Sequence, residues 1–393
     1  MVAAARPDRG LSAAPAPPQR AAARAWRERW QSLRDRWLAS PAFQRHAARL
    51  PFIRAIARRR AAQVFDLVAG FVYSQVLVAC VRLELFDRLA EGAQTLDEIA
   101  ARLGLQRHAA ERLLAAAVAL RLAERRRGGR FGLGPLGAPL VGNRAVAAMV
   151  EHHTLLYADL ADPVALLRGA PTTDKLARYW PYAASADPAR VTDTDVASYS
   201  ALMAASQPLV ADAILGAVDL TRHRCLLDVG GGDGSFVVAA AERAPRLRLA
   251  LFDLPAVAQA AARRFAAAGI SSRAQAHGGS FFDDPLPDGA DVVTLVRVLH
   301  DHDDARVMTL LRAVYRALPE GGRVVVAEPL AETPGAVRMG DAYFGIYLLA
   351  MGSGRPRTLA RLVGMLAEAG FTRVRSLPTP QPLQTAVIVA RRP

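Results

Sequence analysis

The sequence contains very little cysteine, and none of its uncharged apolar runs is long. Cys80 and Cys225, the two cysteines among 393 residues, cannot form a disulfide framework or a four-thiolate zinc site. No N-terminal stretch combines a basic start with an apolar core, so we expect no secretory signal. The longest uncharged apolar run, residues 67–81, has 15 residues, fewer than the ~18–20 that span a bilayer. We therefore expect a soluble, reduced, cytoplasmic protein.

Lysine is almost absent too, and the positive charge is confined to one end of the chain. Lys175 is the only lysine, and 50 basic residues against 36 acidic ones give a net charge of +14. Residues 1–60 contain 14 arginines and three acidic residues, so they carry +11 of that charge. Because the other 333 residues carry only about +3, the bulk of the protein does not have the charge of a nucleic-acid binder.

Residues 1–60 form a basic extension rich in tryptophan and arginine. Between residues 24 and 38, Trp26, Trp30, Leu33 and Trp37 are spaced to share one face of a helix, and arginines occupy the other positions. A basic helix with a tryptophan stripe is typical of an interfacial membrane anchor. The same stripe could equally pack on the protein's own surface or on a partner subunit, and the pattern leaves both interpretations open.

Residues 61–150 are predicted to form a helical domain with a winged-helix arrangement. Thr95 and Glu98 form a capping box that begins one helix, and Gly104 ends it. A second helix over about 107–122 precedes a glycine-rich hairpin at 125–133. Such a domain can bind DNA through its second helix. That helix exposes mainly alanine here, so we favour a use of the domain other than DNA binding.

Residues 151–215 are predicted to be connecting helices with irregularly spaced polar and aromatic side chains. His152 and His153 have no third ligand at helical spacing, so they are poor candidates for a metal site. Paired histidines of this kind are more often hydrogen-bonding groups of a core or pocket. We expect no metal.

Residues 216–393 alternate between strand-like and helical stretches. Six strands are predicted, at 225–229, 247–252, 291–296, 323–327, 374–377 and 386–390. Alternation predicts a mostly parallel α/β sheet, whereas the short connection between the last two strands requires an antiparallel hairpin. The fold class predicted is a Rossmann-like α/β domain with an antiparallel C-terminal hairpin.

A glycine cluster follows the first of these strands. Residues 226–235 read Leu-Leu-Asp-Val-Gly-Gly-Gly-Asp-Gly-Ser, and glycines there let the backbone turn sharply close to a ligand. The spacing differs from the G-x-G-x-x-G pattern of dinucleotide sites. Asp253, at the end of the second strand, is placed to accept hydrogen bonds from a ribose diol. The pair predicts a nucleoside ligand, although a turn and an acid of this kind also occur in α/β proteins without one.

Four motifs in order resemble one enzyme family. Asp228-Val-Gly-Gly-Gly-Asp-Gly, Phe252-Asp-Leu-Pro, Val298-Leu-His-Asp and Ala327-Glu-Pro resemble the small-molecule O-methyltransferases of the caffeate/hydroxyindole type, which use S-adenosylmethionine (SAM). The resemblance runs from about residue 65 to the C-terminus and implies a winged-helix-like dimerisation domain. Within that family, Phe71-Val-Tyr-Ser-Gln and Met339-Gly-Asp-Ala-Tyr-Phe are similar to the bacterial hydroxyneurosporene/demethylspheroidene O-methyltransferases, which methylate the tertiary 1-hydroxyl of acyclic carotenoids.

The resemblance implies a role for particular residues. The cofactor-binding residues it implies are Asp228, Gly230, Gly231, Gly232, Gly234, Asp253, Leu254, Ser206, Ser280 and Phe281. The substrate-binding residues it implies are Met203, Tyr157, Tyr347 and Met351. His300 matches the family's general base, and Glu328 matches a glutamate that orients it. A neutral imidazole can remove the hydroxyl proton while a carboxylate at its other nitrogen fixes the tautomer.

Two positions depart from the family. The Gly-Asp-Met-Phe adenine motif reads Gly-Ser-Phe-Phe at 279–282, so Ser280 replaces an acid. The Lys-Glu-Arg-Thr motif reads Arg-Pro-Arg-Thr at 355–358, so Pro356 replaces the second of two glutamates that flank the histidine. These departures remove an acid from the adenine motif and leave Glu328 as the expected orienting acid.

The function predicted is methyl transfer from SAM, with S-adenosylhomocysteine as product, to a lipophilic hydroxycarotenoid. The expected domains are the extension (1–60), a dimerisation domain (61–150), connecting helices lining the pocket (151–215) and the SAM domain (216–393). A homodimer and peripheral contact of residues 24–38 with the inner membrane are expected, and no nucleic acid. Alternatives are methylation of a phenolic or polyketide hydroxyl, a winged-helix regulator that senses a ligand, and a catalytically inactive partner subunit.

Overall fold

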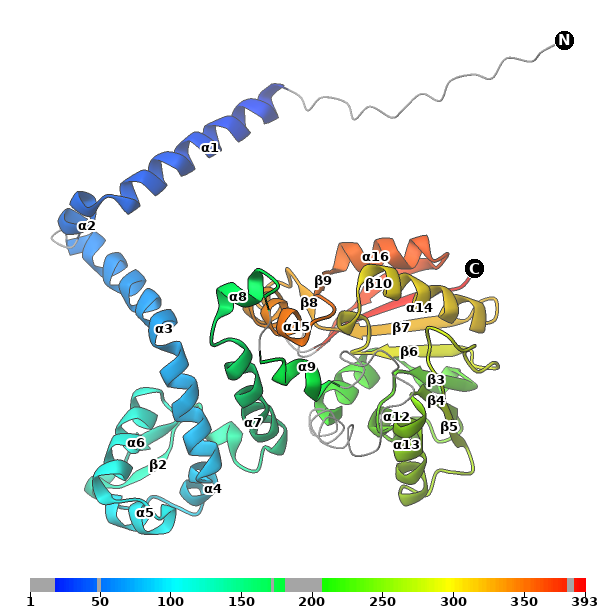
Figure 1. Cartoon of the computed structure of the whole chain (residues 1–393), viewed down its shortest axis with the longest axis horizontal. Helices are drawn as coiled ribbons and strands as arrows, with labels where there is room; N and C mark the ends of the chain where they lie inside the picture. Colours follow the sequence, from blue (N-terminus) through cyan, green and yellow to red (C-terminus); the bar gives the residue numbers. More distant parts are fainter. Residues whose placement is uncertain (1–17, 48–50, 171–172, 181–206, 380–384) are drawn as a thin grey trace. The chain divides into compact units, whose positions relative to one another are not determined.

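The computed structural model describes residues 18–47, 51–170, 173–180, 207–379 and 385–393 (Figure 1). The chain divides into two compact units, residues 1–79 and 80–393. The first unit is helical and comprises α1 (Pro18–Ala39), α2 (Pro41–Ala47) and most of α3 (Pro51–Arg82). The expected helix over 24–38 is therefore confirmed, and it begins earlier in the sequence than its tryptophan stripe.

Helix α3 corrects one expectation. From Ile53 to Arg82 it is long and apolar enough, by length and composition, to cross a membrane. The run of 15 residues was counted without charged residues, so it began only after Asp66. The helix itself continues through Asp66. Length and composition do not separate a membrane span from a helix covered by protein.

The second unit begins with the helical domain. Its elements are the end of α3, α4 (Leu85–Ala90), α5 (Leu96–Leu103), α6 (Arg107–Ala119), β1 (Ala123–Arg125), η1 (Arg127–Gly129), β2 (Phe131–Leu133) and η2 (Ala138–Leu140). The capping box of α5 is present, because Thr95 Oγ1 accepts from Glu98 N and Thr95 N donates to Glu98 Oε2. Strands β1 and β2 pair antiparallel, as the hairpin prediction required.

Short helices then lead to the sheet. They are α7 (Arg144–Asp159), α8 (Pro163–Leu167), α9 (Lys175–Tyr179), a helix over residues 207–217 and η4 (Leu220–Arg222). Near the end of the chain, the connections between strands contain η5 (Leu299–Asp301), the π-helical turn η6 (Arg338–Phe344) and α15 (Gly345–Met351). These elements carry most of the side chains discussed below.

The sheet has seven strands in the order β10-β11-β7-β6-β3-β4-β5. The strands are β3 (Cys225–Val229), β4 (Arg248–Asp253), β5 (Ala274–Gly278), β6 (Val292–Val296), β7 (Arg323–Glu328), β10 (Thr372–Leu377) and β11 (Ala386–Arg391). Strands β3 to β7 are parallel, and β11 pairs antiparallel with β7 and β10. The predicted fold class is confirmed. Strand β5 was not predicted, because its sequence Ala-Gln-Ala-His-Gly has no β-branched residue.

Helices cover both faces of the sheet (Figure 1). One core packs α14 (Asp304–Ala317) and α16 (Leu359–Glu368) on one face of the sheet, and a second packs α12 (Ser235–Arg243), α13 (Pro255–Ala267) and residues 207–217 on the other. Neighbouring residues of β3 face opposite cores, Leu226 with α12 and Leu227 with α14, which is the period-two alternation of a strand buried on both sides. The short pair β8 (Leu330–Ala331) and β9 (Arg357–Thr358) lies outside this sheet.

Candidate active site

The turn after β3 brings the backbone to the edge of a cleft. Gly230 has a φ of 69°, and a Cβ there would lie 2.7 Å from Val298 Cγ2, so no side chain fits. Gly232 N donates to Asp253 Oδ2 at 2.8 Å, which ties the turn to the end of β4. Gly234 is the residue that precedes α12. The predicted glycine cluster therefore forms one turn at the carboxyl edge of the sheet, where α/β proteins bind ligands.

Asp228 lies beneath this turn. It is 1% exposed, and Thr294 Oγ1 donates to its Oδ1 at 2.6 Å. Its Oδ2 has no hydrogen-bond partner in the part of the chain that the structure describes, and a Cβ on Gly231 would lie 2.6 Å from it. Burial raises the pKa of Asp228 to about 7. Its position is that of a support for the turn, and it does not line the cleft.

Asp253 lines the cleft at the end of β4. Its carboxylate accepts from Gly232 N and, at 2.7 Å, from Leu254 N. Burial raises the pKa of Asp253 to about 6, although the two backbone donors oppose that shift. At neutral pH the group is therefore an anchored acceptor, which is what a vicinal diol requires.

Aromatic rings line the other end of the cleft. Ser280 and Phe281, which the sequence analysis assigned to the cofactor, lie there together with Phe282, His302 and Arg306, which it did not identify. The His302 ring lies 5.7 Å from that of Phe281 and 5.0 Å from that of Phe282, and the Arg306 guanidinium lies 5.2 Å from the Phe282 centroid. Burial lowers the pKa of His302 to about 4, so its ring is neutral at pH 7.

The cleft encloses about 680 Å³, including the space at its mouth. Ser280 Oγ donates to Asp283 Oδ2 at 2.7 Å, so the serine that replaces an acid holds an acid three residues later in the sequence. Arg297, Val298 and Asp301 complete the wall nearest to His300.

His300 and Glu328 come together as predicted. His300 lies in η5 and is 7% exposed, and Glu328 is the last residue of β7. His300 Nδ1 lies 2.5 Å from Glu328 Oε2, and Glu328 Oε1 accepts from Val298 N at 2.9 Å and from Leu299 N at 2.7 Å. The carboxylate thus fixes both the ring and the loop that bears it. With Nδ1 protonated toward Glu328, Nε2 is left as the basic nitrogen.

A second carboxylate stands at that nitrogen. His300 Nε2 lies 3.2 Å from Asp301 Oδ1, and Asp301 is also buried. Burial by itself lowers the pKa of His300, but the two carboxylates of Asp301 and Glu328 outweigh it and raise the pKa above its ordinary value. Burial raises the pKa of Asp301 to about 6. The residue adjacent in sequence therefore supplies the second acid that the Pro356 position lacks.

A buried cluster of rings continues from His300. Phe344 lies 5.9 Å from the His300 ring and 6.4 Å from that of Tyr347. Trp180 Nε1 donates to Tyr347 Oη at 3.0 Å, and that hydroxyl lies 2.6 Å from His152 Nε2. The Tyr347 hydroxyl therefore bonds Trp180 and His152 at the same time. Burial lowers the pKa of His152 to about 4, so its ring is neutral at pH 7.

The predicted substrate residues are distributed around this cluster. Tyr347 and Met351 are both buried in it, on α15. Tyr157, on α7, lies 6.5 Å from the ring of His153, whose Nε2 is 2.7 Å from Tyr343 Oη. Both histidines therefore bond tyrosines, as expected for pocket residues. Met203 and Ser206 lie outside the described residues.

Among the described residues, no group of three or more His, Cys, Asp and Glu side chains is arranged to hold a metal ion. The arrangement instead offers a cleft lined by Asp253 and aromatic rings, beside a buried imidazole with two carboxylates. The imidazole can move a proton, and the cleft can hold a second molecule against it.

Known proteins match this chain over most of its length. Residues 157–372 match the O-methyltransferase domain, and residues 65–143 match the O-methyltransferase dimerisation domain. The chain is 47% identical over 359 residues to demethylspheroidene O-methyltransferase of Cereibacter sphaeroides, covering 91% of this chain and 94% of that protein. It is 44% identical over 345 residues to the enzyme of the same name from Rhodobacter capsulatus, covering 88% and 85%. The crystal structure of the S-adenosylmethionine-dependent methyltransferase SibL matches with a TM-score of 0.69 at 28% identity, covering 84% of this chain and 99% of that one.

Proposed function

The chain belongs to the SAM-dependent O-methyltransferase family with an N-terminal dimerisation domain, and from that premise we propose that it methylates the tertiary 1-hydroxyl of an acyclic carotenoid. The observation that carries the proposal is the 47% identity, over 91% of this chain, to a demethylspheroidene O-methyltransferase. The buried ring cluster next to His300 supports it, because an apolar polyene needs an apolar site beside the base.

The cleft residues suit the cofactor. SAM supplies an electrophilic methyl group on a sulfonium that leaves as a neutral thioether. Asp253 would hold the ribose diol, the Gly230–Gly232 turn would admit the methionine portion, and Phe281 with His302 would flank the adenine. Asp228 would act from beneath, by holding the turn in shape through Thr294. Leu254 and Ser280 complete the proposed contacts, with Ser206 from outside the described residues.

His300 is proposed as the general base. Nδ1 is committed to Glu328, so Nε2 takes the proton from the substrate hydroxyl as the new C–O bond forms. A tertiary alcohol is far less acidic than an imidazolium ion. The proton therefore leaves in concert with methyl transfer and not before it.

Asp301 and Glu328 then stabilise the product of that proton transfer. Once both ring nitrogens carry protons, each faces a carboxylate, at 3.2 Å and 2.5 Å. In a buried site such pairs are strengthened by the low local polarity. The same carboxylates raise the pKa of His300 in the free protein. Turnover therefore requires a pH high enough for Nε2 to be unprotonated.

The remaining proposals concern the acceptor and the protein's partners. Tyr347, Met351, Tyr157 and, beyond the described residues, Met203 would line the acceptor site. We propose a homodimer formed through the dimerisation domain, and no nucleic-acid partner. We propose a cytoplasmic protein held at the inner membrane through α1. Trp26, Trp30 and Trp37 are 53–67% exposed on that helix, and its arginines complement anionic lipid.

The test is incubation of the full chain with SAM labelled in the methyl group. Detergent-dispersed 1-hydroxycarotenoids and a panel of phenols are offered separately, and label in ether product is followed by mass spectrometry. Label in the carotenoid supports the proposed acceptor. Label in phenols alone keeps the methyltransferase and discards the carotenoid. Label in neither acceptor class would contradict the proposed function.

A further inference from the structure

Residues 353–357 bind the backbone of the loop that carries His300, residues 299–302. Four consecutive carbonyl oxygens of this loop accept hydrogen bonds from that segment. The bonds are Arg357 Nη1 to Leu299 O (2.7 Å), Arg355 N to His300 O (2.9 Å), Ser353 Oγ to Asp301 O (2.9 Å) and Arg357 Nη2 to His302 O (2.6 Å). Two of the four come from one guanidinium, which reaches carbonyls on either side of His300.

Arg357 is built into this position. Its side chain is 3% exposed, and its third nitrogen, Nε, donates to Asp304 Oδ1 at 2.9 Å. Its backbone belongs to β9 and pairs with Leu330 of β8, two residues beyond Glu328. A buried guanidinium with every nitrogen bonded is rigid, and its fork geometry lets it hold two acceptors at once.

Close packing confirms that segment and loop are fitted to each other. Gly354 has a φ of +78°, and a Cβ there would lie 2.0 Å from His300 O. A side chain at this position would push the segment off the loop.

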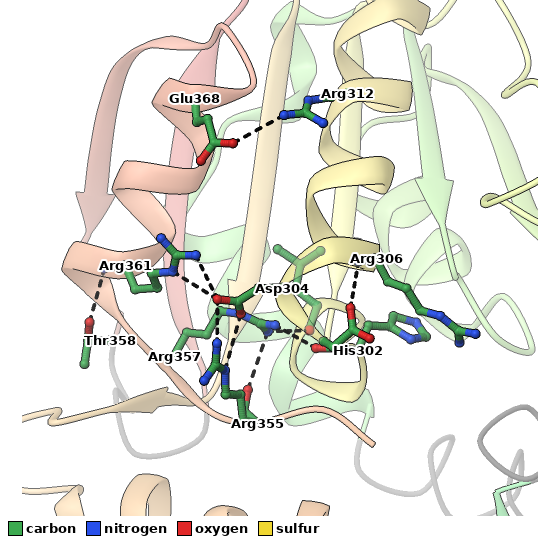
Figure 2. Close-up of polar contacts among 11 residues, drawn as sticks. His302, Asp304, Arg306, Arg312, Arg355, Arg357, Thr358, Arg361 and Glu368 are labelled. Atoms are coloured by element: carbon green, nitrogen blue, oxygen red, sulfur yellow. Dashed lines mark hydrogen bonds and ion pairs between the residues drawn. The ribbon is translucent and has the colours of Figure 1, made fainter. Parts of the chain in front are cut away.

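Asp304 joins three arginines, but only one of them touches the loop with its side chain (Figure 2). Arg355 and Arg361 bond Asp304 from exposed positions, at 2.5 Å and 2.8 Å. Within the described structure Arg361 makes no hydrogen bond to residues 299–302, so it is a natural comparison for Arg357.

We propose that residues 353–357, chiefly Arg357, position His300 for catalysis. Glu328 holds the N–H groups of Val298 and Leu299, and Arg357 holds the carbonyls of Leu299 and His302. The single turn of η5 is thus fixed between an anion and a cation. Arg357 acts through the loop and touches no reacting atom, which makes it a positioning residue. The inference rests on the proposed role of His300.

The test compares Arg357→Lys with Arg361→Ala in the full chain, on whichever acceptor is methylated. A lysine keeps the charge but cannot hold two carbonyls in a fork. We expect kcat to fall about 10- to 100-fold, since small displacements of a catalytic group cost rates of this order. The SAM dissociation constant should stay within about threefold, because the glycine turn and Asp253 are untouched. The pH at which kcat is half-maximal should shift, since the ring moves relative to its carboxylates. Arg361→Ala should change kcat less than about twofold.

A double variant separates this inference from the assignment of the base. If Arg357 acts through His300, then His300→Ala with Arg357→Lys is no slower than His300→Ala alone. A further loss in the double variant, or an unchanged kcat in Arg357→Lys, overturns the inference and leaves the base in place. Full activity of His300→Ala would show that His300 is not the base, and the inference about Arg357 would then be wrong as well.

A milder substitution tests the inference if Arg357→Lys does not fold. Ser353→Ala removes only the bond to Asp301 O, at a half-buried position. A fall in kcat of about threefold at unchanged SAM affinity supports positioning by the segment. An unchanged kcat and pH profile in Ser353→Ala contradicts it.

Discussion

The sheet domain buries its large apolar side chains, whereas the first helical unit exposes many of its own. In the sheet domain, Phe236, Leu226 and Leu251 are fully buried between strands and helices. On α3, Leu67 is 81% exposed, Phe71 70% and Val68 67%. A helix that is apolar on most sides is stable only when something covers it.

This contrast suits a division of roles, in which the sheet domain carries out the reaction and the first helical unit associates with other molecules. The sheet domain contains the cleft, His300 and the carboxylates of Asp301 and Glu328, which are the proposed cofactor site, base and acids. Residues 18–79 carry exposed tryptophans on α1 and exposed apolar residues on α3, which suit association with a partner or a surface. If the separation is correct, substitutions in one region should leave the other region's function intact.

The largest effect is expected for His300→Ala. Loss of a general base costs about 100- to 10,000-fold in kcat, whereas SAM affinity, dimer formation and lipid association should be unchanged. Steady-state kinetics measure kcat, and calorimetric titration measures the SAM affinity. A loss of SAM binding equal to the loss of turnover would break the separation.

Phe71→Glu tests the other side of the comparison. A charge on the exposed apolar face of α3 should raise the dimer dissociation constant about 30-fold or more, since aromatic anchors of interfaces are worth ~2 kcal/mol or more. Light scattering across a dilution series measures it. Val164→Glu, at an exposed valine on α8, is the control and should remain dimeric. If Phe71→Glu dimerises as well as the control, this face is not the interface.

The pH dependence of SAM binding sharpens the account of the cleft. Burial raises the pKa of Asp253 to about 6, so the carboxyl takes up a proton below pH 6 and loses acceptor capacity. The SAM dissociation constant should therefore rise about tenfold per pH unit below 6 and be flat above it. Asp253→Asn should bind more weakly with no such rise. A similar rise in the variant would assign the titration to another group, such as Asp228.

The smallest effect is expected on α1. Replacing Trp26, Trp30 and Trp37 together by alanine should lower the bound fraction on phosphatidylcholine/phosphatidylglycerol vesicles severalfold and leave kcat on a detergent-dispersed substrate unchanged. Vesicle flotation measures binding, and Gln31→Ala on the same helix is the control. Equal flotation of the triple variant and the control would reject a membrane role.

Strong local patterns predicted most of the fold. Apolar runs located six of the seven strands of the sheet, and the Thr95 capping box located the start of α5. Strand β5 escaped because small and polar residues carry no strand signal, and only pairing with β4 makes it a strand. The antiparallel edge followed from a short connection, which excludes a parallel crossover.

The site was predictable where a motif carries it. Gly230, Asp253, His300 and Glu328 stood in recognisable patterns. His302 and Arg306, at the aromatic end of the cleft, stood in no recognisable pattern. They meet Phe281 and Phe282 only in the folded chain, so the sequence around them gives no signal. The loss of an acid at Pro356 was visible in the sequence, but Asp301 at the free nitrogen of His300 was not.

The sequence by itself therefore determined the order of elements, the SAM domain and the candidate base, because each depends on motifs of residues close together in the chain. Tertiary structure decided what surrounds that base. Arg357 reaches across 58 positions to Leu299 O, and Tyr347 bonds Trp180 and His152 from 167 and 195 positions away. These contacts depend on how elements pack, and hydrogen bonds between distant residues form only once the chain has folded.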